Sequence, residues 1–164
     1  MQEIPFLEAI FLFPSKGAPG QRVKEVMAMA GLGLEGDRYA LGTGYYSGRY
    51  DCEVSLIEDE ILQAAMSETD ILLGQGEHRR NLVTRGLRLG DVKGGQLIIG
   101  NVVLEYHRPR PPCDYLQRLT QPGMTKALGK GAGIGMRVLV GGMIREGMEI
   151  QLIRSEKSLA SRLP

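Results

Sequence analysis

The sequence predicts a mostly-β protein, a single-domain barrel of short strands over residues 1–164 with short helical insertions. Three observations lead to this fold class. Glycine accounts for 23 of 164 residues, about twice its usual share of ~7%. These glycines separate short apolar runs, as tight turns between strands do. Only one segment shows clear helical spacing of its apolar residues, and no linker or change of composition divides the chain.

The N-terminal elements are predicted from apolar runs and the residues that bound them. Residues 6–13 are almost wholly apolar and lie between Pro5 and Pro14, which predicts a buried strand. Residues 22–30 predict a second strand, and the glycine-punctuated segment 31–42 predicts a loop.

The helical segment follows a serine that resembles a helix cap. Ser55 and Glu58 have the spacing of a capping box. The apolar positions 56, 57, 61, 62 and 65 then repeat at helical intervals, which predicts a helix to about Met66.

The clearest hairpin covers residues 95–107, where two β-branched runs flank Gly100-Asn101. Residues 136–144 repeat this pattern around Gly141-Gly142, and residues 148–153 predict a final strand.

The bulk composition narrows the class of protein. No run approaches the roughly 20 apolar residues of a membrane helix, and the N-terminus lacks the features of a signal peptide, so a cytoplasmic globular protein is expected. Its two cysteines, Cys52 and Cys113, are expected to be reduced. With two histidines at unsuitable spacing, a metal held by side chains alone is not expected.

The charge is unevenly distributed along the chain, although the net charge is only +1. Residues 1–77 contain 5 basic and 13 acidic side chains, whereas residues 78–137 contain 11 basic and 3 acidic ones. The basic block is a candidate anion site. The alternative is that its arginines form ion pairs with the acidic N-terminal third.

Within the basic block, residues 77–88 concentrate arginine with neutral hydrogen-bonding side chains: Arg79, Arg80, Asn81, Thr84, Arg85 and Arg88. The guanidinium fork suits phosphates and other oxyanions. Nucleic acid is disfavoured, because aromatic residues are only 5% and the pI is about 7.8. One compact anion is the better match.

The glycine run 129–135 does not have the spacing of a dinucleotide fingerprint or a phosphate-binding loop. It precedes a predicted strand rather than a helix. It is interpreted as a plain loop or as one wall of an anion cradle with Lys126, Lys130 and Arg137.

Cys113 is the candidate reactive residue. It follows a proline-stiffened segment containing Arg108 and Arg110, and residues 114–119 predict a short helix beginning beside it. Neighbouring cations and a helix N-terminus favour a thiolate, which can act as a nucleophile or a soft metal ligand. The alternative is a buried, inert thiol. Cys52 lies between two acidic residues and is interpreted as structural.

Six motifs in this order resemble the molybdenum-cofactor sulfurase C-terminal (MOSC) domain family over roughly residues 20–150. They are GLEGDR (33–38), VSLIE (54–58), E-x-R-x-N-L-x-T-R-G (77–86), G-x-x-x-x-I-G-x-x-V-L-E (94–105), PRPPC (109–113) and G-x-x-x-R-V-L-x-G-G-x-I-R-x-G (133–147).

The resemblance implies a MOSC-type β-barrel that binds the molybdenum cofactor. It identifies Cys113 as the family cysteine, catalytic or metal-ligating. The implied cofactor-binding residues are Arg79, Arg80, Asn81 and Thr84, with Arg110 and Arg137 as additions and Gly36-Asp37-Arg38 at the border of the pocket.

The resemblance implies a sulfurtransferase-like activity, in which Cys113 carries a persulfide from a cysteine desulfurase to the cofactor or an acceptor. Two alternatives are a molybdenum-dependent reductase of N-hydroxylated or N-oxide substrates with an electron-transfer partner, and a non-catalytic cofactor carrier. Residues 51–53 depart from the family pattern. No pyridoxal phosphate site, nucleic-acid partner or membrane partner is expected.

Overall fold

A computed structural model describes residues 3–44, 52–111 and 114–155 and consists mostly of strands. The strands are β1 (Phe6–Leu12), β2 (Gln21–Val23), β3 (Glu25–Met29), β4 (Gly33–Leu34), β5 (Val54–Glu58), β6 (Leu82–Arg85), β7 (Gln96–Ile99), β8 (Val102–Pro109), β9 (Ile134–Val140), β10 (Gly142–Arg145) and β11 (Ile150–Ile153). The helices are α1 (Arg38–Leu41), α2 (Asp59–Glu68), α3 (Asp114–Leu119) and α4 (Met124–Leu128), with two short 3₁₀ turns at Leu89–Val92 and Gly129–Gly131.

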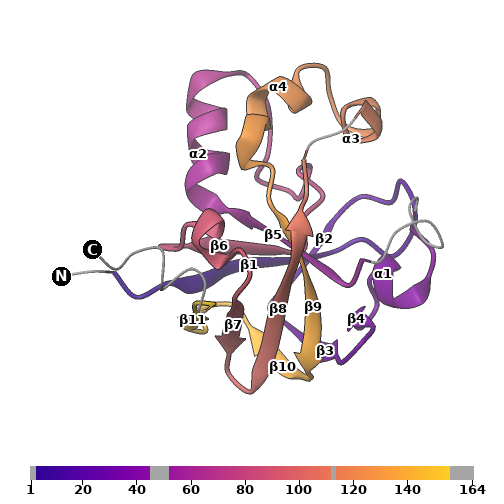
Figure 1. Ribbon diagram of the computed structural model, residues 1–164. Helices are drawn as coiled ribbons and strands as arrows, with labels where there is room; N and C mark the ends of the chain where they lie inside the picture. The colour runs from indigo at the N-terminus through magenta and orange to yellow at the C-terminus, as the bar shows by residue number, and fades with distance from the viewer. Residues whose placement is uncertain (1–2, 45–51, 112–113, 156–164) are drawn as a thin grey trace.

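Eight strands form one sheet in the order β11-β7-β8-β9-β5-β6-β1-β2, and β10-β3-β4 form a second, smaller sheet. The pairs in the large sheet are antiparallel except β5 and β6, which run parallel and are joined through helix α2. Figure 1 shows α2, α3 and α4 together on one side of this sheet and the smaller sheet at its other end.

The large sheet curls because main-chain hydrogen bonds connect strands from its two ends. The Leu7 N–H in β1 donates to the Met148 carbonyl, and the Gly147 N–H donates to the Leu7 carbonyl. The Ile150 N–H in β11 donates to the Pro5 carbonyl. Since β11 is one edge of the sheet and β1 lies next to the other, these bonds draw the ends together. This confirms the predicted mostly-β barrel with short helices.

Two apolar cores form on the two faces of the curled sheet. The inner core contains, among others, Leu7, Leu56, Leu97, Leu104 and Met136. The second core packs the sheet residues Phe11, Ile57 and Val83 against Leu62 of α2 and Leu128 of α4. Burial of apolar surface on both faces is the main stabilising contribution to such a fold.

The helix predicted with Ser55 as its N-cap begins three residues later than expected. Val54–Glu58 is strand β5, between β9 and β6, with Val54 to Ile57 buried. Helix α2 starts at Asp59. The capping-box interpretation is wrong: Glu58 occupies the N-cap position without a side-chain cap bond. The prediction included the end of β5 in the helix because a strand that is buried on both faces is apolar at every position. Its residues 56 and 57 therefore continued the helical spacing of the apolar residues in α2.

Residues 22–30 form two strands instead of one, and these lie in different sheets. Strand β2 pairs with β1, whereas β3 pairs with β10. The predicted loop 31–42 contains the short elements β4 and α1.

Of the two hairpins predicted at glycine-containing turns, one is present and the other is not. The hairpin at Gly100-Asn101 is confirmed, with Ile99 opposite Val102 and Gly100 at φ 61°. The strands flanking Gly141 do not pair with each other, because β10 pairs with β3. At Gly141 the chain passes so close to the Ala28 carbonyl that a Cβ atom would lie 2.6 Å from its oxygen. Glycine therefore permits the crossing between sheets.

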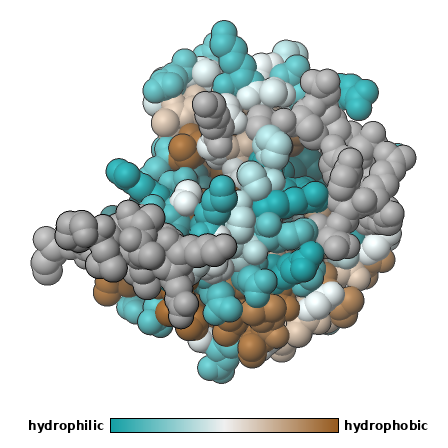
Figure 2. Space-filling view, viewed as in Figure 1, coloured by the Kyte–Doolittle hydropathy of each residue, from teal (hydrophilic) through white to brown (hydrophobic). Residues whose placement is uncertain are grey.

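Hydrophilic and hydrophobic residues occupy different parts of the surface. Figure 2 shows a hydrophilic surface across the middle of the face seen in Figure 1 and an apolar area along its lower edge. The exposed hydrophobic residues at that end include Met27 on β3 and Leu139 and Val140 on β9. Within the described residues, no helix is both long and apolar enough to cross a membrane.

Candidate functional site

A tight turn before β6 delivers two arginines into the interior. Arg79 adopts a positive φ of 59°, which is uncommon for a residue with a side chain. The Arg79 N–H donates to the Gly76 carbonyl, and the Arg80 N–H donates to Nδ1 of His78 at 2.9 Å. Both arginines are buried, so the turn holds two cations at the end of the strand.

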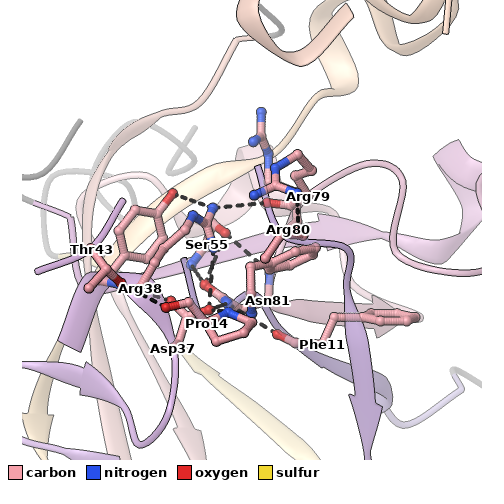
Figure 3. A network of polar contacts seen from close by, with 12 residues as sticks. Phe11, Pro14, Asp37, Arg38, Thr43, Ser55, Arg79, Arg80 and Asn81 are labelled. Carbon is pink, nitrogen blue, oxygen red and sulfur yellow. Dashed lines mark hydrogen bonds and ion pairs between the residues drawn. The ribbon is translucent and has the colours of Figure 1, made fainter. Parts of the chain in front are cut away.

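Asn81 is the hub of the polar network that this turn enters (Figure 3). Its Nδ2 donates to the Phe11 carbonyl at 3.1 Å and to Oδ1 of Asp37 at 2.9 Å. Its Oδ1 accepts from the Ser55 N–H at 3.0 Å and from the Ser55 hydroxyl at 3.2 Å. Its side-chain amide is thus fully engaged with protein groups, and it fastens together β1, β5, β6 and the loop before α1.

Asp37 extends the network to helix α1. Its Oδ2 accepts from the Tyr39 N–H at 3.2 Å as the helix N-cap, and its Oδ1 accepts from the Phe13 N–H at 2.9 Å. The Arg38 guanidinium lies 3.3 Å from the same oxygen. Because both residues are buried, this carboxylate supplies the negative charge that offsets a buried guanidinium.

Two guanidinium groups pack against the ring of Phe13. The Cζ atom of Arg38 lies 4.9 Å from the ring centroid and that of Arg79 lies 4.7 Å from it. Arg79 also donates to the Ala18 carbonyl at 2.6 Å, and Arg38 donates to the Arg79 carbonyl at 3.3 Å. These contacts fix the direction of both side chains.

Arg80 joins the two chain segments that flank the candidate pocket. Its Nε donates to the Ala132 carbonyl at 2.7 Å, and its Nη2 donates to the Arg110 carbonyl at 3.1 Å. The Arg110 N–H in turn donates to the Gly133 carbonyl. The backbone of Arg110 is therefore anchored from two directions, three residues before Cys113.

The pocket itself opens beside β5, β8 and β9 and has an empty volume of about 190 Å³. It is lined by Tyr39, Cys52, Glu53, Val54, Ser55, His107, Arg108, Arg110, Gly135 and Met136. The Tyr39 hydroxyl oxygen accepts from Arg38 Nη2 at 2.9 Å and from Arg110 Nη2 at 2.8 Å. With its oxygen lone pairs engaged in this way, the phenol can offer a ligand its O–H proton.

The sequence interpretation missed Cys52. Its Sγ accepts hydrogen bonds from Arg110 Nη1 at 2.7 Å and from Arg108 Nη2 at 3.4 Å. It lines the pocket. The guanidinium groups lie 56 and 58 residues away in sequence, so only a prediction of the pairing of β5, β8 and β9 could have found them.

Arg137 and Arg85, two other arginines of the basic block, contact different parts of the molecule. Arg137 Nη2 lies 3.1 Å from Nε2 of His107, next to the pocket. Arg85 instead pairs with Asp59 at 2.5 Å. Arg85 therefore agrees with the alternative that arginines of the basic block pair with acidic residues nearer the N-terminus, whereas the anion site stays a prediction.

Thr84 and His78 are buried with one polar atom each that has no hydrogen-bond partner in the part of the chain that the structure describes, Oγ1 of Thr84 and Nε2 of His78. Burial, reinforced by the charge of Arg80, lowers the pKa of His78 from 6.5 to about 3. This imidazole is therefore neutral at physiological pH and accepts from Arg80 through Nδ1.

Cys113 lies outside the described residues, as does Pro112. The predicted helix that follows is present as α3 (Asp114–Leu119). Across the described ranges, no group of three or more His, Cys, Asp or Glu side chains has an arrangement that would hold a metal ion.

Comparisons with known proteins agree with this architecture. The YuaD protein from Bacillus subtilis superposes with a TM-score of 0.77 at 16% identity, over 94% of this chain and 98% of that one. YiiM from Geobacillus stearothermophilus gives 0.71 at 20% identity, over 92% and 75%. YiiM from Escherichia coli gives 0.64 at 19% identity, over 92% and 70%. A search of curated proteins found no significant match.

These likenesses show a shared fold, and a family model adds a match in sequence. The model of the MOSC domain matches residues 43–151, which include β5 to β10 and most of the pocket lining. The chain therefore belongs to the MOSC domain family.

Proposed function

We propose that this MOSC protein binds the molybdenum cofactor and that Cys113 accepts sulfur as a persulfide, delivering it to the cofactor or to another acceptor. The observation that supports this most is the position of Arg110. Its guanidinium lines the pocket, and its backbone is held by Arg80 and Gly133 immediately before the Cys113 segment. An anion anchor and the proposed sulfur carrier are thus near neighbours along the chain.

The pocket suits one anionic part of such a ligand. Arg108 and Arg110 provide cationic donors, and Tyr39 provides a neutral one. Its empty volume of about 190 Å³ includes space that is open to solvent, so the pocket does not enclose a whole ligand. The pocket would therefore contact one exposed anionic end of a larger molecule, a phosphate or the metal end, without surrounding it.

The residues assigned by family resemblance divide into two roles in this proposal. Arg110 would contact the anion directly, with Arg137 acting beside it through His107. Asn81 and Thr84 are fully buried, and Arg80 is bonded to backbone carbonyls on both sides of the pocket. We assign Arg80, Asn81 and Thr84 a positioning role, and Arg79 the same through its packing on Phe13.

The chemistry asked of the chain is a sulfur exchange. The Cys113 thiolate attacks the terminal sulfur of a persulfide on a partner desulfurase, and the partner thiolate leaves. The nearby guanidinium groups balance the negative charge of the sulfur that is carried. The molybdenum cofactor, when bound, supplies an anionic pterin and a metal able to take a terminal sulfur. A reducing compartment such as the cytoplasm suits a persulfide carrier.

The test is anaerobic purification followed by metal analysis and intact-mass spectrometry. We expect a mass gain of about 32 Da that is removed by reduction, as for a persulfide, and absent in Cys113→Ala. Cys52→Ala is the matched control and should retain the gain. Arg110→Gln should weaken cofactor binding about tenfold or more, as loss of a charge-assisted contact does.

Two outcomes would replace this proposal with another. Stoichiometric molybdenum with turnover of N-hydroxylated substrates would make Cys113 a metal ligand of a reductase. Cofactor binding that is unchanged in Cys113→Ala, without any sulfur on the protein, would indicate a carrier. The absence of both cofactor affinity and Cys113 reactivity would contradict the function altogether.

A further inference from the structure

The side-chain hydroxyl of Tyr39 accepts hydrogen bonds from two cations, and its own hydrogen is donated to none of the residues that the structure describes. Arg38 Nη2 donates to the hydroxyl oxygen at 2.9 Å and Arg110 Nη2 donates to it at 2.8 Å. A guanidinium group has only N–H donors, so neither arginine can accept in return. The phenol therefore keeps one O–H donor for a group outside the described part of the chain.

This hydroxyl lies at the wall of the candidate pocket. Tyr39, Arg110 and Cys52 all line the pocket. The Arg110 guanidinium bridges the other two, because its Nη2 donates to the Tyr39 hydroxyl and its Nη1 donates to Cys52 Sγ at 2.7 Å. Tyr39 is half-buried, and the pocket is partly open to solvent. A ligand atom at the pocket can therefore reach the hydroxyl hydrogen.

The buried network, part of which is seen in Figure 3, holds Tyr39 in this position. The Tyr39 N–H donates to Oδ2 of Asp37 at 3.2 Å, and Oδ1 of the same carboxylate accepts from Asn81 at 2.9 Å. Asp37 and Asn81 are fully buried. The Arg38 guanidinium packs over the Tyr39 ring, with its Cζ 4.1 Å from the ring centroid. A donor that is held in advance in this way loses little entropy when a ligand binds.

The surroundings of the hydroxyl determine which kind of ligand atom it can bind. An ammonium nitrogen has no lone pair to accept the O–H and would be repelled by the two guanidinium groups. An unprotonated oxygen of an anion accepts the O–H and is attracted by the same charges. One such oxygen is enough for the contact, which agrees with the small space that the pocket encloses.

We propose that Tyr39 is a specificity-determining residue of this pocket, whose O–H donates to an unprotonated oxygen at an anionic end of the molybdenum cofactor. The inference rests on the proposed function and adds to it a residue that lies outside the six sequence motifs. Arg38 and Arg110 occupy the lone pairs of the phenol oxygen, so the O–H is the group that remains for the ligand. The pocket thereby selects ligand ends that accept hydrogen bonds and rejects those that only donate them.

The first experiment observes Tyr39 by NMR. The chain has six tyrosines, labelled with carbon-13 at the ζ carbon, and the signal that is lost in Tyr39→Phe belongs to Tyr39. Phosphate and molybdate are titrated separately, as models of the two anionic ends of the cofactor. We expect the Tyr39 signal to shift and saturate with at least one of them, which also identifies the end that is bound. The signal of Tyr106, which packs against the inner core and does not line the pocket, should stay constant.

The second experiment measures the affinity for the molybdenum cofactor by anaerobic equilibrium dialysis with metal analysis. Tyr39→Phe keeps the ring beside Arg38 and removes the hydroxyl. It should weaken binding about tenfold or more, as the loss of a hydrogen bond to a charged group does. Tyr106→Phe is the matched control, because it removes a hydroxyl away from the pocket, and it should bind like the parent chain.

A third measurement separates donation to the ligand from support of the two arginines. Replacing Tyr39 by a ring-fluorinated tyrosine makes the O–H a stronger donor and its oxygen a weaker acceptor. Binding of the cofactor at neutral pH should become tighter if the O–H is donated to the ligand. Unchanged or weaker binding would show that Tyr39 acts only by accepting from Arg38 and Arg110, and the proposal would be wrong.

The failure of this inference differs from the failure of the proposed function. Equal cofactor affinity of Tyr39→Phe and the parent chain would overturn the role of Tyr39 and leave the proposed function intact. A parent chain that binds no cofactor would contradict the proposed function, and the NMR titration would then decide whether Tyr39 contacts an anion. A Tyr39 signal that responds to neither phosphate nor molybdate would, in that case, overturn the inference as well.

Discussion

The imidazole of His78 is buried beside the turn that carries Arg79 and Arg80. Its Nδ1 accepts from the Arg80 N–H, so the ring must be neutral at that nitrogen. Burial, with the added repulsion of Arg80, lowers its pKa to about 3. Protonation would break the hydrogen bond that shapes the turn and would place a second cation in the interior.

This histidine makes the stability of the fold depend on pH. Because the folded-state pKa lies below the usual 6.5, the contribution of neutral His78 is complete above pH 6.5 and is lost as pH falls toward 3. The slope from one proton is at most about 1.4 kcal/mol per pH unit. His78→Asn, which retains an acceptor, should flatten the pH dependence of the free energy of unfolding between pH 6.5 and 4.

Urea denaturation at a series of pH values would measure this slope. The control is the parent chain measured in the same pH series, whose slope includes the proton taken up by His78. An unchanged slope in His78→Asn would show that other groups dominate the acid sensitivity.

At the level of residues, the sequence indicated a basic block with site candidates, which stay predictions, and Cys52 was interpreted as structural. The visible neighbours of Cys52 were acidic, whereas its actual partners, Arg108 and Arg110, come from β8 and the residue just beyond it. Charge along the chain describes a site only when the contacts are local. Here the contacts are made across strands.

The connection between the 3₁₀ turn Gly129–Gly131 and β9 has one position that only glycine can fill. Gly133 has φ 114°, and a Cβ atom there would lie 2.1 Å from the Leu56 carbonyl oxygen. Gly133 also accepts from the Arg110 N–H. The glycine run 129–135 therefore includes a residue required for strand packing.

Gly133→Ala should accordingly lower the free energy of unfolding by about 2–3 kcal/mol, the cost of a strained backbone combined with a steric overlap. Gly90→Ala provides the comparison, because nothing lies within 4 Å of a Cβ atom there and its φ is not positive. Its effect should stay within about 1 kcal/mol. Equal effects of the two substitutions in urea unfolding would refute the close approach at Gly133.

The sequence predicted correctly a hairpin whose two strands are adjacent in the chain. It did not predict a strand that pairs with segments distant in the sequence. The β7–β8 hairpin needs only two adjacent runs and a glycine turn. Strand β5 is defined by its neighbours β6 and β9, which follow it by tens of residues. Its apolar residues suit a strand buried on both faces and the first turn of a helix equally well.

For the molecule as a whole, closure of the barrel depends on the main-chain bonds between the β1 region and residues 147–150. If the barrel opens only as a unit, the amides of Leu7, Gly147 and Ile150 should exchange hydrogen with the same free energy of opening as the amides of β5 and β9. Native-state hydrogen exchange measures this. Faster exchange at the closure than in β5 would indicate that the ends separate locally.

The overall class, a mostly-β barrel with helical insertions, followed from glycine content and short apolar runs. The division into two sheets did not, because β2 and β3 are separated by Lys24 alone and β9 and β10 by Gly141 alone. A change of sheet at one residue leaves the alternation of apolar residues nearly intact. Only the pairing partners distinguish the two sheets.

The hydrogen bonds of Asn81 also determine at what stage of folding the pocket can form. Its side-chain bonds reach residues 26, 44 and 70 positions away in sequence, so each one closes a long loop. Contacts of this kind form late during folding, because the chain loses entropy before they are made. The pocket therefore does not exist in any nascent fragment that ends before β6, and ligand capture is an event of the completed chain.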